Sequence, residues 1–230
     1  MQIVESSALG VRAARYSFAS ATSPWTITLF PMIHFGEPEF YEAVYADAFT
    51  HDVVLVEGVR SPVTKRLTRA YRWIGPKIGL IVQPPYPSPE SVPARIVRAD
   101  LDEGEFRKEW QQVPLWLRML VSLVAPIAGL RLRWFESRDD IAKRAELEDR
   151  LSSDEILSWD PQLAALKRGI VDARDRRLLQ HLEQELSGPA AHGSRLAIVY
   201  GAEHMRAVIR ELKRQEFSIA SAGWRTVFHL

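Results

Sequence analysis

The sequence of 230 residues contains no cysteine. This absence excludes disulfide bonds, zinc sites built on thiolates and catalysis by a thiol nucleophile within the chain. It does not identify the cellular compartment. The sequence also lacks an excess of charge of either sign, because 30 basic and 29 acidic residues leave a formal net charge of +1. This balance argues neither for nor against nucleic acid, and we expect no nucleic-acid partner.

Little in the sequence predicts a membrane span or a leader. The most apolar stretch, residues 113–130, is interrupted by Arg118, two prolines and a glycine. A spanning helix needs about 20 predominantly apolar residues. Residues 1–5 lack the basic and then apolar layout of a signal peptide. We therefore expect a cytoplasmic protein.

Apolar residues make up 47% of the chain, which is enough for the core of one domain over residues 1–230. Short apolar runs at 26–33, 52–56 and 195–200 are typical of strands that are buried on both faces. Segments with helical spacing separate them, among them a charged one at 137–151. The pattern predicts an α/β fold with a mixed central sheet and helices on both faces. Residues 61–150 are expected to form a helical insertion or lid.

Three candidate side chains follow the three apolar runs. His34 comes just after the first, Glu57 comes directly after Val-Val-Leu-Val, and His204 lies in the first turn of a predicted helix after the third. In open α/β sheets, ligands bind outside the carboxyl ends of the strands. Two imidazoles and a carboxylate at that edge suit a metal site or acid–base chemistry.

Arg174 is the fourth candidate, because it falls within the apolar stripe of a helix predicted over residues 161–186. An unpaired buried charge is very costly, so Arg174 needs a carboxylate or a ligand unless it reaches the solvent at the edge of the stripe. Asp100 follows another predicted strand, 94–99, and we expect it in an exposed turn.

A basic segment lies at residues 61–74. No acidic residue occurs between positions 58 and 89, whereas six basic residues do. They are Arg60, Lys65, Arg66, Arg69, Arg72 and Lys77. The segment predicts a helix with either a solvated basic face, which we favour, or a face for peripheral contact with a membrane or another anionic partner.

These residues give the chain a resemblance to the TraB/PrgY-like family, which is related to the TIKI-type metalloproteases and more distantly to erythromycin esterases and ChaN-like haem-binding proteins. The family carries a Gly-x-x-His signature near each end. Gly201-Ala202-Glu203-His204 matches it, whereas the first copy has Pro31 in place of glycine. The resemblance implies a mixed sheet flanked by helices and a site assembled from both ends of the chain. Some relatives are hydrolases and others regulate a peptide signal.

We expect a metal-dependent hydrolase that acts on a peptide or amide bond. His34, Glu57 and His204 would hold a divalent ion (zinc, manganese or cobalt), which lowers the pKa of bound water from about 15.7 towards about 7. Arg174 would stabilise developing negative charge or orient Glu57. Two alternatives stay open: a metal-free, esterase-like hydrolase with His34 as general base, and a non-catalytic protein that binds haem or a peptide.

Overall fold

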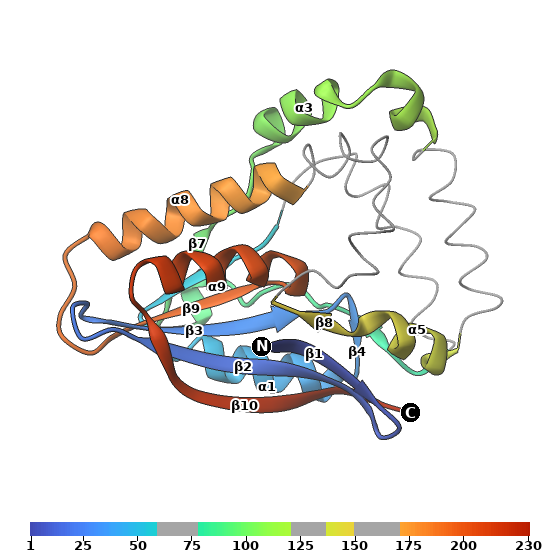
Figure 1. Ribbon diagram of the computed structural model, residues 1–230, viewed down its shortest axis with the longest axis horizontal. Helices are drawn as coiled ribbons and strands as arrows, with labels where there is room; N and C mark the ends of the chain where they lie inside the picture. Colours follow the sequence, from blue (N-terminus) through green and yellow to red (C-terminus); the bar gives the residue numbers. More distant parts are fainter. Residues whose placement is uncertain (59–77, 121–136, 150–170) are drawn as a thin grey trace.

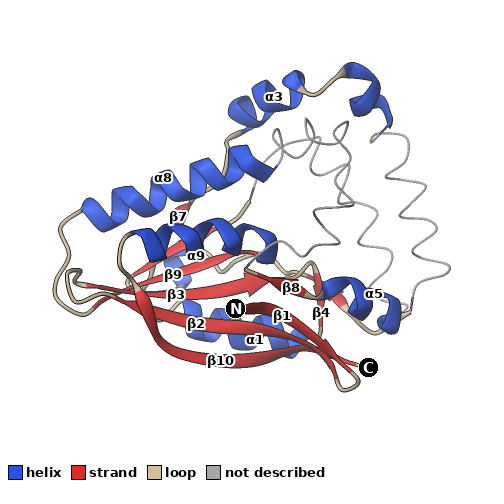
Figure 2. Cartoon of the chain, viewed as in Figure 1, coloured by secondary structure: helices blue, strands red, loops and turns tan. Residues whose placement is uncertain are grey.

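The computed structural model describes residues 1–58, 78–120, 137–149 and 171–230, which form a mixed β-sheet with helices on both faces (Figures 1 and 2). The predicted α/β class is confirmed. The strands are β1 (Gln2–Ser7), β2 (Gly10–Ala19), β3 (Trp25–Met32), β4 (Phe35–Gly36), β5 (Val53–Val56), β6 (Ile81–Val82), β7 (Arg95–Arg98), β8 (Leu147–Glu148), β9 (Ser194–Gly201) and β10 (Ser218–His229). The α-helices are α1 (Pro38–Ala48), α3 (Glu103–Gln112), α5 (Arg138–Ala145), α8 (Ala173–Ser187) and α9 (Met205–Arg214), with 3₁₀ turns η3 (Pro89–Ser91) and η5 (Ala202–His204).

The main sheet has a parallel half and an antiparallel half. Its strand order is β7-β5-β9-β3-β2-β1-β8, and the first four strands run parallel. β2 pairs antiparallel with β3, β1 and β10. Every residue of β5 is buried, as are the five residues 196–200 of β9. The two central parallel strands therefore lie covered on both faces, as their continuous apolar sequences predict.

The connections place helices on opposite faces of this parallel half. The chain crosses from β3 through α1 to β5, and it later returns from the β7 edge through α8 to β9. Parallel crossovers are nearly always right-handed, so two crossovers in opposite directions leave their helices on opposite sides. Figure 1 shows α8 and α9 above the sheet and α1 behind β2, on the far side. Because the four strands run parallel, their carboxyl ends lie side by side along one border of the sheet, which we call the carboxyl edge.

α9 is held to the sheet by an apolar stripe. Met205, Val208, Ile209 and Leu212 are all at most 1% exposed. They recur at helical spacing, as the sequence predicts. Each such side chain contributes about 1.5–3 kcal/mol on full burial. This packing fixes the start of α9, and with it the turn that carries His204.

The middle of the chain differs in part from the expectation. The charged helix predicted at 137–151 ends at Ala145, and Leu147–Glu148 forms β8 against β1. The paired edge of β1 gives Leu147 a better environment than continued helix would. The predicted basic helix 61–74 lies outside the described residues, as does much of the predicted insertion. Of the helices that are described, none has the length and apolarity to cross a membrane.

Candidate functional site

The register of the parallel strands brings distant residues together at the carboxyl edge. Val56 of β5 pairs with Val199 of β9 on one side and with Arg98 of β7 on the other. Met32 of β3 pairs with Gly201 of β9. The residues that follow each strand therefore enter the same region, although they are far apart in the sequence. The strand order therefore brings the residues after these strands together at one edge of the sheet, as the sequence predicts.

All four predicted site residues line one pocket of about 430 Å³: His34, Glu57, Arg174 and His204. Its volume lies within the range of small-molecule sites. The wall also carries apolar side chains from three parts of the chain, including Met32, Leu147 and Val171. Pockets that bind small molecules commonly combine an apolar wall with a few convergent polar groups.

Arg174 of α8 joins two carboxylates from neighbouring strands. Its Nε donates to Oδ1 of Asp100 at 2.9 Å, and its Nη2 donates to Oδ2 of Asp100 at 2.8 Å and to Oε1 of Glu57 at 2.5 Å. The contact with Asp100 is a two-point fork, which fixes the plane of the guanidinium. Of the two predicted environments for Arg174, the carboxylate partner is the one observed.

Asp100 is the anchor of this arrangement, and the expectation that it occupies an exposed turn is wrong. Its side chain is only 1% exposed, against 17% for Glu57. Besides Arg174, it accepts hydrogen bonds from the backbone N–H groups of Gly58 at 2.9 Å and Leu101 at 2.8 Å. Gly58 has φ of +152°, which a side chain would disfavour, and this bend brings its N–H towards Asp100.

The charges around Glu57 keep it ionised. Burial alone would raise its pKa, but the positive charge of Arg174 and those of His204 and His34 when protonated lower it below the usual value. The pKa of Asp100 is lowered in the same way. Burial raises it, but the contacts with Arg174 and with the two backbone N–H groups lower it by more. The pKa of Arg174 is raised by the two carboxylates despite its burial. The cluster therefore carries two negative charges and one positive charge at neutral pH.

Close packing explains why a glycine stands first in the Gly-x-x-His sequence. The backbone N–H of Gly201 donates to Oε2 of Glu57 at 2.6 Å. A Cβ atom at Gly201 would lie 3.0 Å from that oxygen and 3.4 Å from Cδ2 of His204. The missing side chain lets the strand end approach the carboxylate closely, and it leaves room for the imidazole three residues later.

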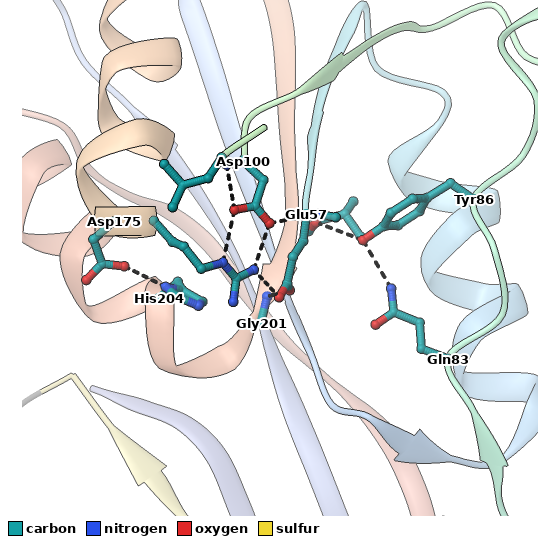
Figure 3. Close-up of polar contacts among 11 residues, drawn as sticks. Glu57, Gln83, Tyr86, Asp100, Asp175, Gly201 and His204 are labelled. Carbon is teal, nitrogen blue, oxygen red and sulfur yellow. Dashed lines mark hydrogen bonds and ion pairs between the residues drawn. The ribbon is translucent and has the colours of Figure 1, made fainter. Parts of the chain in front are cut away.

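His204 is paired with a carboxylate that the sequence analysis did not identify. The imidazole is 5% exposed, and its Nδ1 lies 2.6 Å from Oδ1 of Asp175 (Figure 3). The ring of Tyr200 packs edge-on against it, with centroids 4.9 Å apart and planes at 84°. With the proton on Nδ1, that N–H donates to Asp175 and Nε2 keeps its lone pair. The pair thus fixes both the tautomer and the orientation of His204.

His34 occupies a different environment. Its side chain is exposed, and it lines the pocket from the turn between β3 and β4. It lies close enough to Glu57 that its positive charge, when present, lowers the pKa of that carboxyl group. His34 is thus a residue of the pocket wall, whereas His204 is held rigidly within it.

The three predicted metal ligands line the pocket together, but they do not fit a three-ligand metal centre as they stand. Within the part of the chain that the structure describes, no three His, Asp or Glu side chains are grouped so that they could hold an ion. Both oxygens of Glu57 already accept hydrogen bonds, and one lies beside the guanidinium of Arg174. A divalent cation there would be repelled by Arg174. The divalent ion therefore stays a prediction from the sequence.

Asp100 and Asp175 were not predicted as site residues, for different reasons. Asp100 follows directly after a strand, as Glu57 does, so the same signal identifies it. Asp175 stands in the charged run Arg174-Asp175-Arg176-Arg177, which resembles a solvated helix face. Only the packing of α8 over the start of α9 reveals its contact with His204.

Replacing Arg174 by methionine should lower the free energy of unfolding by about 3–5 kcal/mol, because it leaves two carboxylates without their counter-charge. Chemical denaturation at neutral pH measures this. Arg176→Met on the same helix is the matched control. Arg176 is 61% exposed on its side chain and contacts Glu109 only at 3.9 Å, so that variant should lose no more than about 1 kcal/mol. Equal losses in the two variants would contradict the buried cluster.

The cluster also predicts a pH dependence. A carboxyl group whose pKa is lowered in the folded state stabilises the fold above its unfolded pKa of about 4, and this contribution disappears as pH falls through the folded value. Asp100→Asn should therefore be less stable than the wild type at pH 7, and the gap should narrow as pH falls below about 4. Denaturation curves across this range test it, with exposed Glu39→Gln as control. A gap that stays constant would refute the assignment.

Comparison of the chain with protein-family models, with curated proteins and with solved structures found no match. The TraB/PrgY-like resemblance therefore stays a prediction from the sequence motifs, and the case for function depends on the pocket itself.

Proposed function

We propose that the chain is a hydrolase for an ester or amide bond, including a peptide bond, with His204 as the general base. The observation that carries this proposal is the Asp175–His204 pair, which lies in the same pocket as a guanidinium held by two carboxylates. Acyl transfer to water uses a general base, a carboxylate that orients this base and a fixed cation that stabilises the oxyanion.

In the proposed reaction, Nε2 of His204 takes a proton from a water molecule as the water oxygen attacks the carbonyl carbon. The carbonyl π electrons move to the oxygen, which becomes an oxyanion. When the carbonyl re-forms, the bond to the leaving oxygen or nitrogen breaks, and His204 returns the proton to that atom. Asp175 is a positioning residue, since it stabilises the protonated imidazole and holds its ring in place.

Arg174 supports the same reaction through its remaining donor. Its Nε and Nη2 are engaged by Asp100 and Glu57, whereas Nη1 has no hydrogen-bond partner among the described residues. Arg174 lines the pocket, so Nη1 can donate to the developing oxyanion. Glu57 and Asp100 fix the guanidinium before the substrate arrives, which avoids reorganisation during the reaction.

Two features favour His204 over His34 as the base. His204 is buried and has a carboxylate on Nδ1, whereas His34 is exposed at the turn after β3. A base must be held within hydrogen-bond reach of the proton it removes, and a fixed ring achieves this at lower entropic cost. We propose that His34 contacts the substrate at the pocket wall.

Replacing His204 by alanine should reduce kcat for a responsive ester or anilide substrate by about 10²–10⁴-fold. Asp175→Asn should cause a loss within the same range, because the two side chains act as one unit. Steady-state kinetics with a panel of chromogenic esters and amides provides the measurement. The control is His192→Gln, which changes an exposed loop histidine and should leave kcat unchanged. Full activity in His204→Ala would end the proposal.

Chelation separates the proposed mechanism from the metal-dependent one. We expect dialysis against a chelator to leave turnover unchanged, because no step of the proposed mechanism uses an ion. Metal analysis of the purified protein accompanies the assay. If chelation abolishes turnover and zinc, manganese or cobalt restores it, the metal-dependent hydrolase predicted from the sequence is supported instead. Specific binding of haem or a peptide without any turnover would support the non-catalytic alternative.

A further inference from the structure

The long strand β10 forms an outer edge of the sheet. It pairs antiparallel with β2 along its whole length (Figure 1). Among the described residues, the only backbone hydrogen bond on the other edge of β10 is from N–H of Glu37 to the carbonyl of Val227 at 2.8 Å. The backbone of β10 before Val227 therefore offers donors and acceptors on that edge that no strand of the described ranges pairs with.

This edge has only some of the features by which proteins usually prevent edge pairing. Such features are charged side chains, proline and bulges. The register of β10 shifts near both ends, between Ile219 and Ser221 and between Thr226 and Phe228, which leaves 221–226 as a regular stretch. This stretch contains no proline or acidic residue, and its only charge belongs to Arg225, which pairs with Asp47 of α1. It is therefore open to another strand.

We propose that residues 221–225 of β10 form a dimer interface with the same residues of a second copy of this chain. Two identical strands can pair antiparallel about a two-fold axis, which makes the contact closed and self-complementary. With the axis at Gly223, the central residue of these five, Arg225 faces Ser221 of the partner subunit and Trp224 faces Ala222 of the partner subunit. No like charges are brought together, so charge repulsion does not oppose the backbone hydrogen bonds between the two strands.

Trp224 gives this pairing an apolar contribution. The residue is 40% exposed in the single chain, and the guanidinium of Arg12 lies 5.4 Å from its ring centroid. In the proposed pairing, the two Trp224 side chains are diagonal neighbours on one face, about 7–8 Å apart at the backbone and within reach of each other. Dimerisation would thus cover an exposed indole, which is costly to leave in water.

The size of the contact predicts its strength. Five residues per subunit are few compared with the roughly 20–30 residues on each side of a standard interface. Backbone hydrogen bonds contribute only modestly in net terms, because they replace bonds to water. We therefore expect a dimer whose population depends on concentration, in equilibrium with folded monomer.

Gly223 is the position at which to test the pairing. A Cβ atom there would meet nothing within 4 Å, so a side chain fits. Within the subunit Gly223 pairs with Arg15 of β2, which tolerates an acidic neighbour. Gly223→Glu would set two carboxylates opposite each other across the two-fold axis and should raise the dissociation constant at least about fivefold in sedimentation experiments. Gly223→Gln, equal in size and uncharged, should dimerise like the wild type.

A charge-swap experiment completes the test. Gly223→Lys should also weaken its own dimer, and mixing it with Gly223→Glu should restore dimerisation as a heterodimer. Matching circular dichroism and melting curves confirm that each variant is folded. A wild type that stays monomeric at all concentrations would overturn the proposal. The proposal would also be overturned if Gly223→Glu dimerised as tightly as Gly223→Gln, since the dimer would then use another surface. Neither result would alter the proposed hydrolase, whose assay involves different residues.

Discussion

The arrangement of the pocket depends on one guanidinium that bridges two carboxylates. Asp100 and Glu57 come from adjacent parallel strands, and their negative charges would repel each other without Arg174. The fork with Asp100 is the more buried half, and it sets the direction from which Arg174 reaches Glu57. Because three strand ends and one helix meet in this cluster, a change at any member alters the geometry presented to a substrate.

The fold explains how a site can be assembled from the whole length of a chain. Parallel strands place their carboxyl ends side by side whatever their separation in sequence, and the intervening helices move to the faces of the sheet. Glu57 and Gly201 are in contact although 144 positions separate them. The antiparallel strands β1, β2 and β10 extend the sheet, and Val4 of β1 reaches the wall of the same pocket.

The sequence predicts the parts of the site that depend on local pattern. His34, Glu57 and His204 follow buried strands, and strand ends converge in every fold of this class, so their common pocket is predictable. The buried arginine is also predictable, because a charge within an apolar stripe needs a partner. Which residue serves as that partner is harder to predict from the sequence. Asp100 carries the same signal as Glu57, but Asp175 is hidden in a charged run, and its role arises only from the contact between α8 and α9.

The position of β9 in the sheet has a consequence for how the polypeptide reaches its native state. β9 lies between β3 and β5, yet it is the next-to-last strand in the chain. During synthesis, the earlier strands emerge with their inner edges unpaired until residues 194–201 insert between them. Such non-local pairing is intrinsically slow, and until it is complete the unpaired strand edges are prone to aggregation. Until β9 inserts, the parallel half of the sheet therefore has a gap between β3 and β5.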